Sequence, residues 1–402
     1  MKRTLSIDAN KLLIIQTLFF LSIGLSGLFV NVYLWKLTAN MTEIAWYNIW
    51  SYTAVLAVSL MSGWIARKKS ITFCLRMGLL GFVIYYLSIL LLNEKAVHYL
   101  VFLGFLSGFG TGCFYYAQNT LVYYVTNQVN RGYYLGISGA LAAFTGIVSP
   151  IVSGWIISSN QALTGYHFVF LLTFLLFVIA GAISYRAKDF QLQREYHLSS
   201  ILAFKDKHTW RMILVGNFFI GFQDGAVAFI INILLYLVFQ SEMSLGNFTT
   251  FISLLTVLSS YGIGKYITKA NQELIFLAGA IFTIMATGVL ITWTNYSGVI
   301  IYGLLIAIFK CWWNIPFMTI NYEVIEKTIH PPEQFGDYMI VREIPLNLGR
   351  IAGIILFIIM NQFFINEEAI KILLAFLSLM ILLVYGYFRF FSERKHNGTS
   401  IF

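Results

Sequence analysis

Long, uninterrupted runs of apolar residues follow one another along the whole chain, and they restrict its possible folds more than any other feature. A helix needs roughly 20 apolar residues to cross the hydrocarbon core of a bilayer. Only 11% of the 402 residues are charged, against about 25% in soluble domains, so polar side chains are too few to cover a globule in water. Strands of transmembrane barrels alternate polar and apolar residues, and these runs do not. The sequence therefore predicts an all-α polytopic membrane protein.

Twelve segments are long and apolar enough to be predicted as transmembrane helices. They fall at roughly 12–35, 44–66, 71–92, 97–125, 133–157, 167–185, 212–239, 247–267, 274–293, 297–322, 338–361 and 369–390. The first follows Lys2, Arg3 and Lys11, as the apolar part of a signal peptide would. Its apolar stretch is too long for one and no small-residue cleavage site follows, so we expect a retained span.

The basic residues are distributed unevenly between the two ends of these spans. With the N-terminus in the cytoplasm, 20 of the 26 Lys and Arg residues fall on the cytoplasmic side, and only Lys36, Lys95 and Lys371 fall outside. Because cytoplasmic loops retain Lys and Arg, both termini are predicted in the cytoplasm, in the cell membrane of a bacterium. The same bias accounts for the net charge of +9, so no nucleic-acid partner is expected.

The spans divide into two halves of six, and the halves resemble each other weakly. We expect an N-terminal bundle at 1–186, a cytoplasmic linker at 187–211 and a C-terminal bundle at 212–402. At an offset of 201, Gly24 matches Gly225 and Asn31 matches Asn232. Two parallel six-helix halves with pseudo-twofold symmetry are typical of transporters.

Several kinds of chemistry lack their sequence signals. The three cysteines lie far apart, and all six histidines fall in loops or at span edges, so no metal site is predicted. No phosphate-binding loop is present, and no cofactor is expected. Gly104, Gly108 and Gly112 have the spacing of close helix packing within membranes.

Charged residues within the spans are the strongest functional candidates, because a charge at mid-membrane costs about 2.5–3.5 kcal/mol on insertion scales. The N-terminal half has none near mid-depth. The C-terminal half has Asp224, Lys310, Arg342, Glu343 and Arg350. Arg342 lies close enough to the interface for its side chain to extend towards the headgroups.

Helical spacing groups the embedded polar residues into stripes. The three stripes are Asn217, Gly221 and Asp224 on 212–239, Lys310, Asn314 and Asn321 on 297–322, and Glu343, Asn347 and Arg350 on 338–361. Buried ion pairs that fix helix packing would give the same pattern.

Neutral residues add further candidates for binding an organic solute. Asn31, Tyr116 and Asn119 lie in N-terminal spans, and Trp312 and Trp313 lie deep in the tenth. Their side chains suit stacking and hydrogen bonding to a solute, although helix packing explains them equally well.

Two motifs resemble those of the major facilitator superfamily. The fifth span reads Gly146-Ile-Val-Ser149-Pro150-Ile-Val-Ser153-Gly154, which is similar to the family's Gly-x-x-Gly-Pro-x-x-Gly-Gly antiporter signature with two Gly replaced by Ser. The loop after the second span contains Gly63, Arg67 and Lys68, as in the family's Gly-x-x-x-Asp-Arg-x-Gly-Arg-Lys loop, but lacks its Asp. The resemblance covers essentially the whole chain.

The resemblance has two implications for individual residues. In this family the seventh, tenth and eleventh spans border a central cavity, which implies that Asp224, Lys310 and Arg350 face one another and leave one positive charge in surplus. The motifs imply a gating role for their own residues, which are Gly63, Arg67, Lys68, Gly146, Pro150 and Gly154.

Together these observations predict a monomeric secondary active transporter, not an enzyme, that exports a small organic solute in exchange for protons by alternating access. Asp224 or Glu343 would carry the proton. Lys310 and Arg350 would either bind the anionic group of the solute or release the carboxylate on exchange. Asn314 and Asn347 would also contact the solute. Uptake of a sugar-like or anionic nutrient is the alternative, and a polytopic membrane enzyme or lipid flippase is a further one.

Overall fold

The structure, a computed structural model, describes residues 5–127, 129–161, 163–191, 208–328, 335–363 and 366–394. Within these ranges it contains twelve α-helices and no strand, as the apolar runs predict. Eleven stretches of these ranges are long and apolar enough to cross a membrane, and one of them, at 71–125, comprises two helices joined by a 3₁₀ turn. The predicted all-α membrane fold is confirmed.

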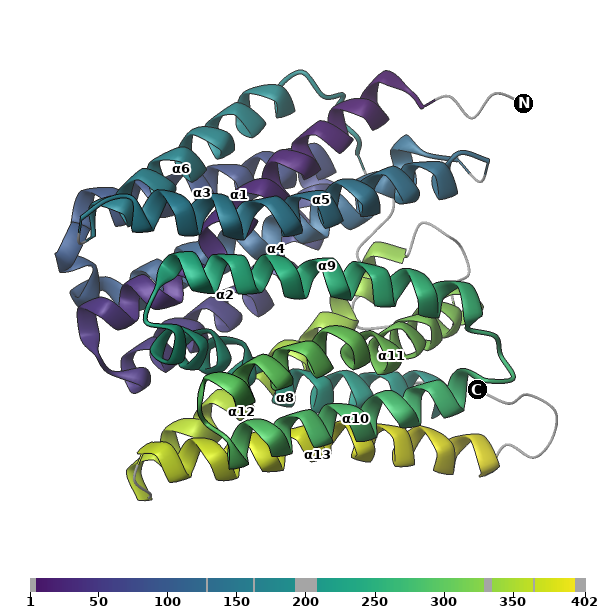
Figure 1. Cartoon of the computed structure of the whole chain (residues 1–402). Helices are drawn as coiled ribbons and strands as arrows, with labels where there is room; N and C mark the ends of the chain where they lie inside the picture. Colours follow the sequence, from purple (N-terminus) through teal and green to yellow (C-terminus); the bar gives the residue numbers. More distant parts are fainter. Residues whose placement is uncertain are drawn as a thin grey trace. The chain divides into compact units, whose positions relative to one another are not determined.

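The helices of the first half are α1 (Ile7–Thr38), α2 (Met41–Lys68), α3 (Ile71–Leu92), α4 (Leu100–Val125), α5 (Arg131–Ser158) and α6 (Thr164–Ser184), with the 3₁₀ turn η1 (Asn93–Tyr99) before α4. The second half contains α8 (His208–Phe239), α9 (Glu242–Tyr266), α10 (Gln272–Thr292), α11 (Tyr296–Thr328), α12 (Phe335–Phe363) and α13 (Asn366–Arg394) (Figure 1). Most extend a few residues beyond the predicted spans. Arg67 and Lys68 therefore lie in the last turn of α2 and not in a loop.

Polar residues at the span edges define where helices begin and end. Ser6, Asn40 and Ser70 accept hydrogen bonds from the first-turn N–H groups of α1, α2 and α3, as N-caps do. Ala39 takes a left-handed conformation, with φ 48°, and its N–H donates to the Trp35 carbonyl. Two residues are therefore enough to join α1 to α2.

The chain forms two compact units, which we name the N-terminal unit (residues 1–198 with 241–250) and the C-terminal unit (199–240 with 251–402). Of the predicted linker at 187–211, residues 192–207 lie outside the described ranges. In the N-terminal unit, α1 packs on α5 and α6, and α3 packs on α4 and α6. In the C-terminal unit, α8 packs on α12 and α13, and α10 packs on α11 and α13 (Figure 1). These four pairings of helices thus recur in the two units.

Glycines bring some of these helices very close together. A Cβ at Gly104 or Gly108 of α4 would lie 2.3 or 2.0 Å from the backbone oxygen of Tyr47 or Ser51 on α2. The predicted close packing of this glycine run is confirmed. The outward faces of the helices remain apolar, for example at Phe144 and Trp155, as suits helices that face lipid.

Candidate functional site

A chain of charged and polar side chains follows one face of α12. Glu343 accepts a hydrogen bond from Arg342 Nη2 at 2.9 Å and a second from Asn347 Nδ2 at 3.3 Å. Asn347 Oδ1 in turn accepts from Arg350 Nη1 at 3.1 Å. The predicted stripe of Glu343, Asn347 and Arg350 is therefore a connected network, in which the Glu343 carboxylate contacts Arg342 directly and Arg350 through Asn347.

Arg342 is only 8% exposed and pairs with Glu343. Burial of two charges in a span is tolerable only when they compensate each other, and this adjacent ion pair provides that compensation.

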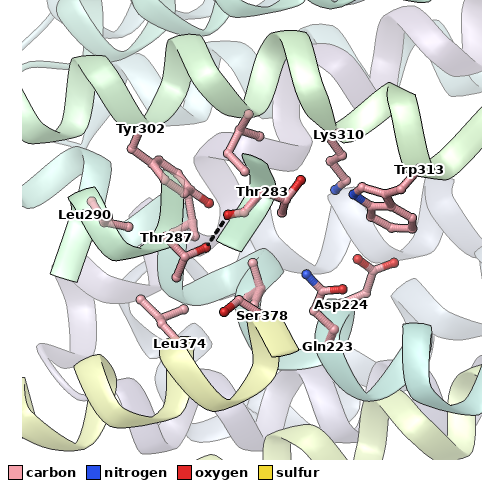
Figure 2. Close-up of a pocket in the computed structure, with 13 residues that line it drawn as sticks. Gln223, Asp224, Thr283, Thr287, Leu290, Tyr302, Lys310, Trp313, Leu374 and Ser378 are labelled. Carbon is pink, nitrogen blue, oxygen red and sulfur yellow. Dashed lines mark hydrogen bonds between the residues drawn. The ribbon is translucent and has the colours of Figure 1, made fainter. Parts of the chain in front are cut away.

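Asp224 and Lys310 line one pocket inside the C-terminal unit, between α8, α10, α11 and α13 (Figure 2). Within the described part of the chain, neither side chain makes a hydrogen bond or an ion pair. Arg350 does not line this pocket. The structure therefore brings together two of the three charges that the family resemblance grouped, and it places the third in the α12 network.

The stripes of α8 and α11 meet at a different point. Asn217 Nδ2 donates to Asn321 Oδ1 at 2.7 Å, and both residues are buried. Gly221, which lies between Asn217 and Asp224 in the α8 stripe, packs against α12, where a Cβ would lie 2.0 Å from the Leu346 oxygen. This contact fixes the position of α8 against α12.

Three further glycines continue the contact between α8 and α12. Cβ atoms at Gly225, Gly349 and Gly353 would lie 2.1–2.3 Å from backbone oxygens of the facing helix. Both helices thus carry a Gly-x-x-x-Gly pattern, the signal of close packing in membranes. The pattern is readable in the sequence, and it places Asp224 one residue from the contact.

Two other proposed solute-binding residues, Trp312 and Trp313, have different surroundings. Trp312 Nε1 donates to Ser259 Oγ at 3.3 Å on α9, whereas Trp313 is 2% exposed and lines the pocket with Asp224. Asn314 is half-buried on the same helix.

The N-terminal candidates belong to the other unit. Asn31 accepts from Asn48 at 3.5 Å, Tyr116 is buried and Asn119 is exposed. The structure places all three on α1 and α4.

The residues of the two family motifs have local partners within the N-terminal unit. Arg67 Nη1 donates to the Gly63 carbonyl at 2.8 Å, and Lys68 lies over the Trp64 ring at 4.0 Å. Both contacts lie within α2.

On α5, the two serines that replace the signature's glycines donate to backbone oxygens of α1. Ser149 and Ser153 reach Leu21 and Leu25 at 3.4 and 2.7 Å. The replacements thus bind α5 to α1.

The first turns of α9 belong to the N-terminal unit and pack on α5. A Cβ at Gly154 would lie 2.6 Å from the Glu242 oxygen, and one at Gly246 would lie 2.4 Å from the Pro150 oxygen. A Cβ at Gly146, by contrast, would meet no neighbouring atom within 4 Å, so the close approach is confined to the end of the motif near Gly154.

Sequence analysis missed an ionic cluster in this region. Glu242 accepts hydrogen bonds from Lys36 and from the Tyr166 hydroxyl, the latter at 2.9 Å. Lys36 also lies over the Tyr166 ring, 5.1 Å from its centroid. Glu242 lies at the edge of its apolar run and 206 residues from Lys36, so their contact could not be predicted from spacing. The only indication in the sequence was the position of Lys36, one of three basic residues predicted outside.

Within the described residues, no group of three or more His, Cys, Asp or Glu side chains is placed to hold a metal ion. Long apolar helices, two units with a repeated packing pattern and charges inside the spans together define a polytopic membrane transporter.

A sequence model of the Major Facilitator Superfamily matches residues 12–354, and the chain belongs to this family. It is a transporter and not an enzyme. It is 30% identical over 401 residues to the uncharacterized protein YqgE of Bacillus subtilis (strain 168), covering 98% of this chain and 93% of that protein. It is also 35% identical over 164 residues to an uncharacterized protein of Geobacillus stearothermophilus encoded in the sodM 3′ region, covering 41% of this chain and 77% of that protein.

Solved structures share the fold at low identity. The nucleoside transporter NupG aligns with a TM-score of 0.71 at 13% identity, over 96% of this chain and 99% of its own. A bacterial homologue of the iron transporter ferroportin, in its inward-facing state, aligns with a TM-score of 0.72 at 12% identity, over 95% of this chain and 98% of its own. The different substrates in these names show that the fold alone does not define the solute.

Proposed function

We propose that this transporter exports a small organic solute in exchange for protons. It acts as a monomer in the cell membrane, with both termini in the cytoplasm. The observation that carries the proposal is the hydrogen-bonded network of Arg342, Glu343, Asn347 and Arg350 inside the α12 span. Charges in spans are rarely kept without a function, and this network contains a titratable carboxylate at its centre.

Protonation of Glu343 changes both of its contacts in that network. The neutral carboxyl group loses its ion pair with Arg342 and offers Asn347 a weaker acceptor. Asn347, which also accepts a hydrogen bond from Arg350, then loses its charged partner, so the proton on Glu343 alters the surroundings of Arg350. Proton uptake and solute binding are thereby linked through one helix.

The remaining candidates complete this scheme. Asp224 is the second carboxylate that can carry a proton, and Lys310, with Arg350, attracts the anionic part of the solute. The side chains that contact the rest of the solute are Asn314, Asn347, Trp312, Trp313, Tyr116, Asn119 and Asn31.

Gating requires contacts that form in one state and break in another. The Lys36–Glu242–Tyr166 cluster and the close approach at Gly154 and Gly246 have this character, because ion pairs and glycine contacts separate without disturbing a packed apolar core. Arg67 and Lys68, at the end of α2, are the candidates on the opposite side of the membrane.

Export is supported by the antiporter-like motif of α5, and the orientation is supported by the charge bias of the sequence. Uptake of a sugar-like or anionic nutrient remains the second candidate, because aromatic and polar groups such as Trp312 and Asn314 suit such a solute equally.

The test uses purified protein in liposomes that contain a pH-sensitive dye. Pools of amino acids, sugars, nucleosides and organic acids are added separately across an imposed pH gradient. We expect one pool to move protons opposite to its own direction. Glu343→Gln should lower proton movement at least about tenfold while exchange of labelled for unlabelled solute persists.

Glu368→Gln, an exposed carboxylate at the start of α13, is the matched control and should behave as the unaltered protein. Full proton coupling in Glu343→Gln would remove this residue from the mechanism. Movement of protons in the same direction as the solute would replace export with uptake.

A further inference from the structure

The pocket that contains Asp224 and Lys310 has the properties of a binding site. It lies wholly inside the C-terminal unit, with walls from α8, α10, α11 and α13, and has a cavity volume of about 40 Å³. At 10–15 Å³ for each water molecule, this is room for on the order of three waters, the size of a very small organic solute.

Three buried polar atoms of the pocket have no hydrogen-bond partner in the described part of the protein. They are Gln223 Oε1, Thr283 Oγ1 and Trp313 Nε1, and their residues are only 8%, 3% and 2% exposed. Buried polar groups are nearly always paired, because an unpaired one loses its hydrogen bonds to water without replacement.

Other polar residues of the same pocket are satisfied by their own helices. Thr287 donates to the Thr283 carbonyl at 3.0 Å (Figure 2), and Ser378 donates to the Ala375 carbonyl at 2.8 Å. The hydroxyl groups of Thr287 and Ser378 are therefore structural, whereas the three unpaired atoms are available to a ligand.

The charged groups of the pocket are arranged by sign. Figure 2 shows the Lys310 ammonium group beside the Trp313 indole nitrogen, and the Asp224 carboxylate with the Gln223 amide across the pocket from them. One side thus offers donors and a positive charge, and the other offers acceptors and a negative charge. Lys310 is exposed and Asp224 is half-buried, so both are open to a solute.

We propose that this pocket binds a small zwitterion, with its ammonium group on Asp224 and Gln223 Oε1 and its carboxylate on Lys310 and Trp313 Nε1. A simple cation would leave Lys310 uncompensated within the span, and a simple anion would leave Asp224 uncompensated. Only a solute with both charges satisfies both sides. The Thr283 hydroxyl, which can donate or accept, serves either end.

This inference deepens the proposed function, because it names the class of solute, but it depends on neither the proton nor the direction of transport. Binding to purified protein therefore tests it separately.

Three probes of nearly equal size distinguish the charges. Glycine carries both groups, ethanolamine has a hydroxyl in place of the carboxylate, and glycolate has a hydroxyl in place of the ammonium group. Binding of labelled glycine to the full chain in detergent, with the other two as competitors, should show glycine binding at least about tenfold more tightly than either, since each loses one set of charge-assisted hydrogen bonds.

Variants of the two charged residues should weaken the binding of different probes. Asp224→Asn should weaken glycine and ethanolamine but not glycolate, and Lys310→Gln should weaken glycine and glycolate but not ethanolamine. Trp313→Phe keeps the packing and should act as a milder form of Lys310→Gln. Lys265→Gln, an exposed lysine at the end of α9, is the control for loss of positive charge in the same unit.

Equal competition by all three probes, or variants that affect them equally, would overturn the proposal. Absence of binding by any probe, in protein that unfolds at its normal temperature, would overturn it too and make the pocket a site for water only. Coupled transport of another pool without glycine binding would contradict this inference alone, whereas glycine binding without proton coupling would contradict the proposed function alone.

Discussion

The two units share a packing pattern but have different interiors. The N-terminal unit is filled by neutral rings: Phe19 stacks on Phe114 with centroids 3.5 Å apart, and Phe82 stacks on Phe177 at 4.7 Å. Some of its buried polar groups pair with one another, as the hydroxyl groups of Tyr47 and Tyr85 do at 2.7 Å. The C-terminal unit places charges in the corresponding space, on α8, α11 and α12.

This difference shows how one repeated fold supports two roles. Stacked rings and paired hydroxyl groups stabilise a single arrangement. Embedded charges cost free energy in every arrangement, and they are concentrated in the C-terminal unit. The N-terminal unit is thus mainly a scaffold, whereas the proposed proton carriers and most of the proposed solute-binding residues lie in the C-terminal unit.

Removal of a ring from the scaffold is expected to have the largest effect on stability. Phe19 is 1% exposed and contacts five other rings, among them Phe114. Phe19→Ala should lower the free energy of unfolding by about 3 kcal/mol. This is the lower end of the range for such changes, because unfolding exposes the ring to lipid and not to water. Thermal unfolding in detergent measures the loss. Phe144→Ala, at an exposed ring of α5, should change little, and an equal loss in both would contradict the scaffold role.

Close glycine contacts should matter equally in both units. Gly108→Ala on α4 and Gly225→Ala on α8 each place a methyl group within 2.3 Å of a backbone oxygen, and each should cost about 1–3 kcal/mol through overpacking. Gly288→Ala on α10 is the control, since nothing lies within 4 Å of its Cβ position. If only one of the two variants loses stability, close glycine contacts do not stabilise the two units equally.

The helices and the embedded charges were both predictable from the sequence, for one physical reason. A bilayer requires long apolar segments, and against such a background each charge stands out, so Asp224, Lys310, Glu343 and Arg350 were found without a structure. Spacing also grouped Glu343, Asn347 and Arg350, because residues at i, i+4 and i+7 share a helix face.

The partners of those charges were not predictable. Spacing along one helix defines a face but not the helix opposite, so it could not separate Arg350 from the pocket of Asp224 and Lys310. Gln223 and Thr283 are neutral residues on different helices, and their lack of partners is visible only once the helices are packed. Glu242 was missed because its contact with Lys36 joins distant parts of the chain.

The smallest expected effect comes from the serines of α5, and it tests whether the scaffold uses polar contacts at all. Ser153 is fully buried and donates to the Leu25 oxygen at 2.7 Å. Ser153→Ala should lower stability by about 1 kcal/mol, the usual net value of such a bond. Ser158→Ala, at an exposed hydroxyl group on the same helix, should be neutral in the same thermal unfolding measurement. If Ser153→Ala is equally neutral, the hydroxyl groups that replace the signature's glycines do not bind α5 to α1, and the scaffold is held by its rings and glycines alone.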